Sequence, residues 1–508
     1  MFAKIKSLYM NGLQAIEIDV EVDTHRSALP SFSIVGLPDT AVQEAKERVR
    51  SAIRNAGFHF PIERIVVNLA PADVRKEGSS FDLPIAMGIL KATGQIEFDE
   101  NQHYFSGELS LDGNLRQIPG MLPMTLFLDE LPAKAGINLF CPFGNIHEIH
   151  ARKAVVYPAK NLEEVSEYLS GKRSWVDYSP CLDEKSETDH EEIGDFAEVA
   201  GQDFAKRALE VAASGFHNII MTGPPGTGKT MMAKRLRSIL PPMSQEEAIE
   251  VTKIYSITGL LSSGQRLIRM RPFRSPHHSA SYVSIVGGGA NPKAGEITLA
   301  HRGILFMDEF PEFRKDIINM LRQPLEEGSV TIARMKSTIC FPARFLLIAA
   351  MNPCPCGFLG DPQKECTCNP AQVIRYRSRL NGPIMDRMDI VTEVQRIDST
   401  HLISGKKQEA SADILTRVQR THHIQEERYK NETFLFNSDI PAKSLHQYCV
   451  ANAEAKGFLE KVAQRMQLSG RAITRALKVA RTIADMRESA MIEMPDIAEA
   501  LQYRLRES

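Results

Sequence analysis

Residues 223–230, GPPGTGKT, constrain the fold of this chain more than any other stretch. They fit the pattern G-x-x-x-x-G-K-[ST] at every required position, between the apolar run HNIIMT and the helical pattern MMAKRLRSIL. Glycines there let backbone N–H groups turn inward around a phosphate at the positive end of a helix. A chance glycine loop would lack this strand-to-helix context. The stretch therefore predicts a phosphate-binding loop in an α/β core with a parallel sheet.

The expected nucleotide contacts are Gly223, Pro224, Pro225, Gly226, Thr227, Gly228, Lys229 and Thr230. Lys229 would reach the β- and γ-phosphates, and the Thr230 hydroxyl would ligate Mg²⁺. A second apolar run, GILFMDEF (303–310), ends in two carboxylates at the same sheet edge. Asp308 would hold Mg²⁺ and its water, and Glu309 would polarise the attacking water. ATP and Mg²⁺ are therefore the expected cofactors.

The composition places the chain among globular proteins. With 508 residues it is too long for one ordinary core, and roughly three domains are expected. Apolar residues make up 43% and charged residues 24%, and no run approaches the ~18 apolar residues of a membrane span. The opening, MFAKIKSLYMNGLQAIEIDV, is a poor signal peptide. We expect a cytoplasmic protein that does not associate with membranes.

Composition shifts along the chain predict its organisation. Residues 1–170 alternate β-like runs such as RIVVNLA with helical patterns, over Thr40 to Ala56 and Leu83 to Thr93, and predict an α/β domain. Residues 171–195 are rich in acids and poor in aliphatics, as in a solvated linker. Strand-like and helical segments alternate again over 196–395. The last segment, 396–508, is helical, with TRALKVARTIADMRES as its clearest amphipathic stretch.

Four of the eight cysteines lie together, at Cys354, Cys356, Cys366 and Cys368. Two close pairs separated by a turn can supply the four soft ligands of a tetrahedral zinc ion, although the C-x-C spacing is shorter than the usual C-x₂₋₄-C. A C-x-C disulfide would be strained and out of place in a reducing compartment. Free thiols, redox chemistry and an iron–sulfur cluster remain as alternatives. A structural zinc clip is the preferred interpretation.

The net charge of −2 confines any nucleic-acid binding to local patches. Two segments contain no acidic residue: one lies between Glu250 and Glu296, and the other lies between Glu327 and Asp361. The basic residues proposed as DNA contacts within them are Arg269, Arg271, Arg274, Arg334 and Lys336. Such side chains would bind phosphates without reading bases, which gives salt-sensitive binding. The alternative is that these charges face other subunits or solvent.

With these residues in view, the sequence resembles the Mg-chelatase-like AAA+ family of the ComM/YifB type. The resemblance covers essentially the whole chain. It is carried by RPFRSPHHSAS, AGEITLAHRGILFMDEFPEF, RQPLEEGSVTIAR, FPARFLLIAAMNPCPCG and LSGRAITRALKVARTIADM. It implies a ring-forming homo-oligomer, expected to be a hexamer, with a C-terminal helical lid. In this family ComM proteins are DNA motors that promote branch migration during natural transformation.

The resemblance assigns further roles. Asn352, at the end of the strand FLLIAAMN, would be the sensor that orients the attacking water. Arg387 would be an arginine finger for the neighbour's γ-phosphate. Arg471 would be a second sensor that folds onto the nucleotide. From spacing alone, a surface arginine or an ion pair is an equal alternative for Arg387 and Arg471.

The two basic segments also receive structural assignments from the resemblance. The segment with RMRPFRSPHH would be an insertion in the second helix of the core. The segment EEGSVTIARMKSTICFPAR would be a pre-sensor β-hairpin, with its tip near Arg334 to Lys336 in the central channel of the ring.

The N-terminal part resembles a Lon-type protease domain, whose catalysis uses a serine–lysine dyad. Ser80 in KEGSSFDLPIAM falls at the place of the serine, but Leu122 stands where the lysine is expected. A serine hydroxyl without a base is not an activated nucleophile. We therefore expect a catalytically inactive domain with a role in assembly or DNA contact, unless Lys134 substitutes.

The sequence thus predicts an ATP hydrolase that translocates on single- or double-stranded DNA and promotes branch migration. Two other classes remain open. A magnesium chelatase motor subunit would lack the fused Lon-like domain and the cysteine cluster. A protein-remodelling chaperone would present an aromatic pore loop, where this chain has ARMKS.

Overall fold

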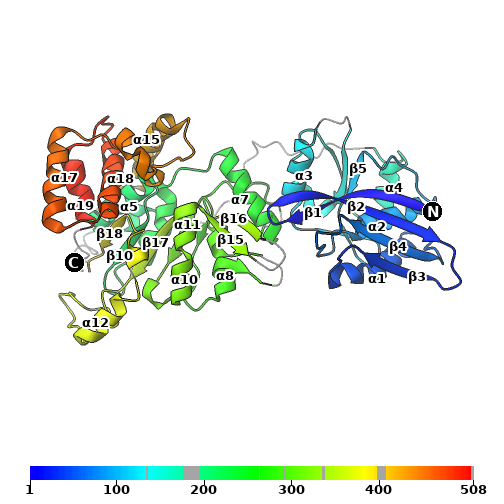
Figure 1. The fold of residues 1–508 in the computed structure, drawn as a ribbon, viewed down its shortest axis with the longest axis horizontal. Coiled ribbons are helices and arrows are strands. Elements are labelled where there is room, and N and C mark those ends of the chain that lie inside the picture. The colour runs from blue at the N-terminus through cyan, green and yellow to red at the C-terminus, as the bar shows by residue number, and fades with distance from the viewer. Residues whose placement is uncertain are drawn as a thin grey trace. The chain divides into compact units, whose positions relative to one another are not determined.

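The computed structural model describes residues 1–132, 136–174, 194–261, 264–289, 293–333, 338–380, 382–396 and 408–504. The chain forms two compact units (Figure 1). One unit comprises Met1–Asp189 and Ala248–Ile268, and the other comprises His190–Glu247 and Arg269–Ser508. Residues 248–268, which the predicted boundaries assign to the central domain, cluster with the first unit.

The first unit is built on a seven-stranded mixed sheet with the order β3-β4-β2-β1-β5-β8-β9. Its strands are β1 (Phe2–Asn11), β2 (Gln14–His25), β3 (Ser31–Val35), β4 (Arg64–Ala70), β5 (His103–Phe105), β8 (Asn138–Pro142) and β9 (Val155–Ala159), with a separate short pair, β6 (Glu108–Leu109) and β7 (Leu115–Arg116). Its helices are α1 (Thr40–Asn55), α2 (Asp82–Ala92), α3 (Met121–Glu130) and α4 (Leu162–Leu169). The two predicted helices are confirmed as α1 and α2.

Helix α2 is the buried centre of the first unit. Gly88 lets the sheet approach closely, because a Cβ there would lie 2.4 Å from Cγ2 of Val22 on β2. At the start of α2, the buried carboxylate of Asp82 accepts two hydrogen bonds from Arg48 on α1, at 2.7 and 3.0 Å. The pair satisfies a charge that would otherwise be costly inside the unit.

The second unit contains a five-stranded sheet with the order β11-β14-β17-β10-β18, in which every pairing is parallel. The strands are β10 (Ile219–Thr222), β11 (Phe273–Arg274), β14 (Ile304–Met307), β17 (Leu346–Met351) and β18 (Ile390–Glu393). All residues of β14 and β17 are buried, as expected for a parallel sheet covered on both faces. The predicted α/β core with a parallel sheet is confirmed.

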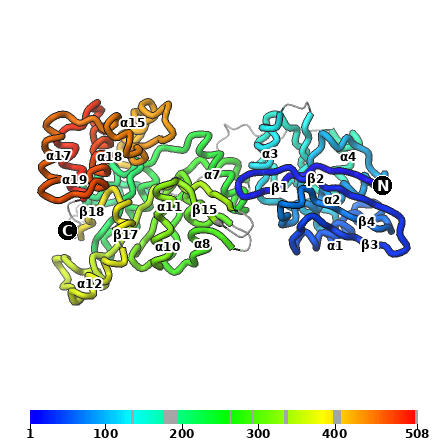
Figure 2. The backbone as a smooth tube through the Cα atoms, in the orientation of Figure 1, coloured from blue at the N-terminus to red at the C-terminus, as the bar shows by residue number. Residues whose placement is uncertain are grey.

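The second unit also contains two short strand pairs and a set of helices outside the sheet. The strand pairs outside the sheet are β12 (Gly287–Gly288) with β13 (Lys293–Ala294), and β15 (Ser329–Ala333) with β16 (Thr338–Pro342). The helices are α5 (Asp203–Gly215), α6 (Lys229–Arg235), α8 (Tyr282–Val286), α9 (Glu296–Leu299), α10 (Lys315–Met320), α11 (Arg322–Glu327), α12 (Pro370–Arg377), α13 (Gly382–Met385), α15 (Ser411–Tyr429), α16 (Leu445–Tyr448), α17 (Ala453–Met466), α18 (Gly470–Met486) and α19 (Met494–Gln502). Helix α7 (Gln245–Thr258) begins in this unit and continues with residues assigned to the first. In Figure 2, α12 stands out from the rest of its unit.

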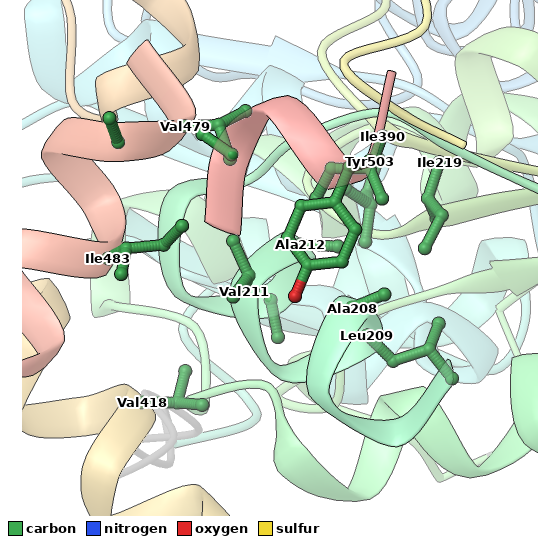
Figure 3. Close-up of a cluster of buried hydrophobic side chains, with 14 of the residues drawn as sticks. Ala208, Leu209, Val211, Ala212, Ile219, Ile390, Val418, Val479, Ile483 and Tyr503 are labelled. Atoms are coloured by element: carbon green, nitrogen blue, oxygen red, sulfur yellow. The ribbon is translucent and has the colours of Figure 1, made fainter. Parts of the chain in front are cut away.

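The C-terminal helices pack on the core through α5. Figure 3 shows Val479 and Ile483 of α18 and Val418 of α15 around the α5 side chains Val211 and Ala212. This confirms the predicted amphipathic helix and the helical C-terminal region. Within the described residues, no helix has the length and apolar character needed to cross a membrane.

A buried carboxylate, Asp485, joins the C-terminal helices. Its side chain is 0% exposed and lies 2.5 and 2.8 Å from the Arg428 guanidinium of α15. Arg481, one turn earlier on α18, donates to it at 3.0 Å, and the Asn437 amide donates at 2.8 Å. Removing one partner of such a group leaves buried charges unpaired.

We expect Asp485→Ala to destabilise the protein by about 3–5 kcal/mol, because Arg428 and Arg481 would lose their counter-charge. Urea unfolding followed by circular dichroism would measure the loss. The control is Arg420→Ala, which removes an exposed ion pair to Glu488 at 2.9 Å and is expected to cost less than about 1 kcal/mol. Equal shifts of the urea midpoint for both variants would contradict the prediction.

Candidate functional site

The phosphate loop connects β10 to α6 at the carboxyl edge of the parallel sheet. Gly226 and Gly228 adopt positive φ angles of 77° and 89°, which other residues rarely adopt. Gly223 is held against the last strand, since a Cβ there would lie 2.2 Å from the Val394 carbonyl oxygen. Its N–H donates to Met351 O at the end of β17, at 3.2 Å. The loop is therefore fixed by both strands that flank β10.

The Lys229 side chain is folded onto its own loop. It is 8% exposed, and its ammonium donates to the carbonyl oxygens of Gly223 and Pro224 at 2.7 and 2.9 Å. It also donates to Asn352 Oδ1 at 3.3 Å, which brings the lysine and the predicted sensor together. Burial lowers the pKa of Lys229 to about 8, although the nearby Asp308 carboxylate opposes the shift.

A hydroxyl and a carboxylate that could both ligate a metal ion lie in contact beside the loop. The Thr230 hydroxyl donates to Asp308 Oδ2 at 2.7 Å, so α6 and β14 present a hydroxyl and a carboxylate at one point. Mg²⁺ is bound by oxygen ligands of this kind. The arrangement fits the predicted magnesium role of both residues.

Glu309 follows in a left-handed conformation, with φ 51°. Non-glycine residues store strain in such conformations, often at functional sites. One carboxylate oxygen of Glu309 lies 3.3 Å from Nδ1 of His278, in the segment after β11. His278 belongs to the acid-free segment between Glu250 and Glu296. In this structure it contacts the candidate catalytic carboxylate.

The four clustered cysteines are brought together by the segment between β17 and α12. Their sulfur atoms all lie within 4.8 Å of one another. Cys354, Cys356 and Cys366 are separated by 3.4, 3.5 and 3.7 Å between sulfurs, close to the ~3.8 Å that tetrahedral Zn–S bonds of ~2.3 Å imply. The Cys356 N–H donates to Cys368 Sγ at 3.4 Å. The donor set and its spacing are compatible with zinc.

The thiols of the cluster differ in acidity. Hydrogen bonds from the backbone of Phe358 and Thr367 lower the pKa of Cys356 to about 5, so this thiol loses its proton first. The pKa of Cys366 and that of Cys368 are raised, because burial and the neighbouring thiols disfavour further thiolates. The seven described cysteines are all free, so the structure has no disulfide in this part of the chain.

Arg387 and Arg471 lie at the opposite, amino edge of the sheet. The Arg387 carbonyl accepts from the Asn218 amide immediately before β10, and the Arg387 guanidinium pairs with Glu326. Arg471 at the start of α18 lies 3.2 Å from Asp386. Arg471 therefore lies with Arg387 and away from the phosphate loop of the same chain, and its role as a second sensor stays a prediction. The Arg471 side chain is 69% exposed, whereas that of Arg387 is only 11% exposed.

The amino edge also contains a cavity of about 650 Å³. Cationic side chains in its wall include Arg344, Arg387, Arg471, Arg475 and Lys478. Arg475 donates to the buried Asp389 at 2.8 Å. The histidine His217 lies 3.7 Å from the same carboxylate. The cavity is thus a charged pocket supported by buried ion pairs.

Asn218 is a residue that sequence reasoning missed. Its Oδ1 accepts from the Leu347 N–H of β17 at 2.9 Å, and its Nδ2 donates to Arg387 O at 3.4 Å. Its backbone N–H donates to Asp389 at 3.1 Å. One side chain therefore ties the starts of β10, β17 and β18. The signal was present as a polar residue directly before a buried strand.

The side chains predicted to contact DNA differ in their exposure and in their hydrogen-bond partners. Arg269 is exposed. Arg271 is only 5% exposed, and its guanidinium donates to Glu247 and to the carbonyls of Pro241 and Arg302, so its prediction as a DNA contact is not supported. Arg274 is held by Glu296 at 2.6 and 2.7 Å, which leaves it unsuited to a free phosphate contact.

The predicted hairpin is present as the antiparallel pair β15 and β16, in which Ala333 pairs with Thr338. Its proposed DNA contacts, Arg334 and Lys336, lie outside the described residues.

The N-terminal unit has no assembled serine–lysine dyad among its described residues. Ser80 is half-buried just before α2, and no described lysine hydrogen-bonds its hydroxyl. Leu122 is 1% exposed within α3. Lys76 is buried and directs its ammonium to Pro71 O, and burial lowers its pKa. Lys134 lies outside the described residues. The predicted inactivity and the Lon-like fold of this domain stay predictions.

Comparison with protein families identifies three matching segments. Residues 195–402 match the model for the magnesium chelatase subunit ChlI, and residues 408–504 match the model for the C-terminal part of that subunit. Residues 20–145 match a further model for the subunit ChlI of Mg-chelatase.

Similar proteins cover nearly the whole chain. The YifB protein of Salmonella typhimurium is 42% identical over 97% of this chain and 95% of its own length. The competence protein ComM of Haemophilus influenzae is also 42% identical over the same shares. The magnesium-chelatase 67 kDa subunit of Heliobacterium mobile is 25% identical over 39% of this chain and 34% of its own length. This chain therefore belongs to the Mg-chelatase-like AAA+ family that contains ComM and YifB.

Proposed function

We propose that this protein is an ATPase that assembles as a ring, translocates on DNA and promotes branch migration. One observation supports a ring. The residues of the candidate hydrolytic site lie in two groups, one at the carboxyl edge and one at the amino edge of the same sheet. The carboxyl edge presents Lys229, Asp308 and Asn352, and the amino edge presents Arg387 and Arg471. A single chain cannot place both halves on one nucleotide, whereas a closed head-to-tail ring completes each site. A hexamer is the proposed size.

Each residue at the carboxyl edge has a role in this proposal. The loop N–H groups and Lys229 bind the phosphates, while Thr230 and Asp308 hold Mg²⁺, which neutralises charge that develops on them. Glu309 accepts a proton from the attacking water, and Asn352 orients that water. From the neighbouring subunit, Arg387 and Arg471 approach the terminal phosphate. These cations would stabilise the charge of the transition state.

The DNA part of the proposal is supported by the chemistry of two acid-free segments and by membership of a family that contains a competence protein. After the correction for Arg271 and Arg274, the proposed contacts are Arg269, Arg334 and Lys336. Contacts made only with phosphates tolerate any sequence, as movement along DNA requires.

The cysteine cluster is proposed to hold one structural zinc ion per chain. Four sulfurs at nearly tetrahedral spacing, with N–H groups directed at them, are the supporting observation. All four positions would be filled by protein ligands. The site would leave no open position for catalysis.

The alternative motor of a metal-insertion enzyme predicts a different activator. Such a motor would respond to a partner protein and not to nucleic acid. ATP hydrolysis with and without DNA therefore separates the two functions.

We expect single- or double-stranded DNA to stimulate ATP hydrolysis by the purified protein at low salt. The stimulation should fall at high salt, because phosphate contacts release counterions. Glu309→Gln should reduce hydrolysis by about 10²-fold or more, since the water loses its base, and serves as the blank. Basal hydrolysis that no form of DNA stimulates would overturn the proposed DNA motor.

The proposed DNA contacts of the hairpin predict a specific change in the salt dependence of DNA affinity. Arg334→Ala combined with Lys336→Ala should weaken DNA binding and reduce the slope of log affinity against log salt by about 1.5, because two phosphate contacts are lost. Fluorescence anisotropy with labelled DNA at several salt concentrations would measure the slope. The exposed Arg420→Ala serves as a control that should leave it unchanged. An unaltered slope in the double variant would remove the hairpin from the interface.

The pH dependence of nucleotide binding tests Lys229. Its ammonium is the form that attracts phosphates, and burial lowers its pKa to about 8. Below pH 8 the lysine is already charged, so affinity for Mg-ADP should be constant. Above pH 8 binding requires proton uptake, and affinity should fall by up to about tenfold per pH unit. Lys229→Met should bind weakly and without this dependence. Equal wild-type affinity at pH 7 and pH 9.5 would contradict the prediction.

A further inference from the structure

The cysteine cluster lies against the candidate nucleotide site. Cys354 follows Asn352 by two residues and is fully buried. Met351, just before Asn352, accepts the Gly223 N–H of the phosphate loop at 3.2 Å. The segment that carries the cluster therefore starts at two residues that already contact the loop.

A direct contact joins the cluster segment to the phosphate loop. Gly357, next to Cys356, has a φ of 84° and packs on the Pro225 ring. A Cβ at Gly357 would lie 2.7 Å from Cδ and 2.8 Å from Cγ of Pro225, closer than real Cβ contacts allow. The backbone of the cluster segment is therefore one wall of the phosphate loop.

The C-terminal end of the cluster segment, at α12, packs back against the core near Asn352. Tyr376 of α12 is buried in the core beside the sheet. Burial raises its pKa to about 12, opposed by a hydrogen bond from the backbone of Asn352. On the outer side, Asp361 is held 3.0 Å from Arg396, which follows β18. Between these anchors, the four sulfurs are the only described cluster of metal-ligand side chains.

We propose that metal binding at the four cysteines and nucleotide binding at the phosphate loop are thermodynamically linked through the contact of Gly357 with Pro225. The ligands are a thiophilic divalent cation, Zn²⁺, and a nucleoside di- or triphosphate. The inference rests on the proposed nucleotide site, and it adds a regulation of that site. Cys354 and Cys356 both belong to the turn that the Gly357 N–H closes by donating to Cys354 O at 3.0 Å. Zinc bound to these two cysteines fixes the turn, and this holds Pro225 and the loop glycines in place.

Linkage acts equally in both directions. If zinc strengthens nucleotide binding by a given factor, the nucleotide strengthens zinc binding by the same factor. Loss of zinc would leave four thiols without a crosslink and free the turn from the loop. Conditions that oxidise or alkylate the cysteines would then inhibit nucleotide binding.

The first test follows zinc itself. Zinc-loaded full-length protein is mixed with the chromogenic chelator 4-(2-pyridylazo)resorcinol, with and without Mg-ADP. At equilibrium we expect the nucleotide to raise the affinity of the protein for zinc, measured against the chelator, by at least about fivefold, in the usual range of coupling between sites. Lys229→Ala controls for zinc binding by free nucleotide, and it should abolish the effect. An equal equilibrium distribution of zinc between protein and chelator with and without nucleotide in the wild-type protein would overturn the linkage.

The second test uses two matched glycines of the same segment. Gly357 and Gly360 have similar φ angles, 84° and 81°, so alanine strains the backbone equally at both. A Cβ at Gly360 meets nothing within 4 Å, whereas one at Gly357 meets Pro225. Both variants should retain one zinc per chain. Gly357→Ala should weaken Mg-ADP binding by about tenfold or more relative to Gly360→Ala, and Gly360→Ala should stay within about twofold of wild type.

The outcomes separate the two proposals. Nucleotide binding that depends on neither zinc nor Gly357 overturns the linkage and leaves the ATPase intact. Absence of DNA stimulation overturns the DNA motor, while the linkage still holds if zinc transfer responds to nucleotide. A wild-type protein that binds no nucleotide would overturn both.

Discussion

The register of three parallel strands determines the whole candidate site. Thr222 of β10 pairs with Met351 of β17, and Met307 of β14 pairs with Ala349. Each strand therefore ends within a few ångströms of the next, and the residues that follow them, Gly223, Asn352 and Asp308, meet at one edge. A slip of one residue would exchange the side chains between the two faces of the sheet and separate these ends. Because both faces of β14 and β17 are buried, each face would then have to repack around different side chains.

The same parallel arrangement divides the chemistry between two edges. The candidate phosphate and magnesium ligands follow the strands, whereas Arg387 precedes β18 and Arg471 belongs to α18. Within one chain, Arg387 pairs with Glu326 and Arg471 lies 3.2 Å from Asp386. In the proposed ring, each subunit would present half of a hydrolytic site on each edge of its sheet.

Motif and periodicity predicted those parts of the fold that depend on local sequence. The loop at 223–230, the strand ends at Asp308 and Asn352, and the helix within 470–486 are specified by neighbouring residues. Contacts between residues far apart in the sequence could not be predicted. Arg271 looks like a free cation in an acid-free segment, but Glu247 of α7 neutralises it in the interior. Gly357 carries no local signal, and Asn218 carries only that of a polar residue before a buried strand, because their contacts form only when distant strands and loops pack together.

Asn218 shows how the two edges can influence each other. It lies at the start of β10, whose other end is the phosphate loop, and its side chain contacts β17, whose other end is Asn352. It also holds the backbone of Arg387. Close-packed strands do not stretch, so a displacement at one edge is transmitted to the other. In the proposed ring, the nucleotide bound by one subunit would therefore adjust the arginine that the same subunit offers to its neighbour.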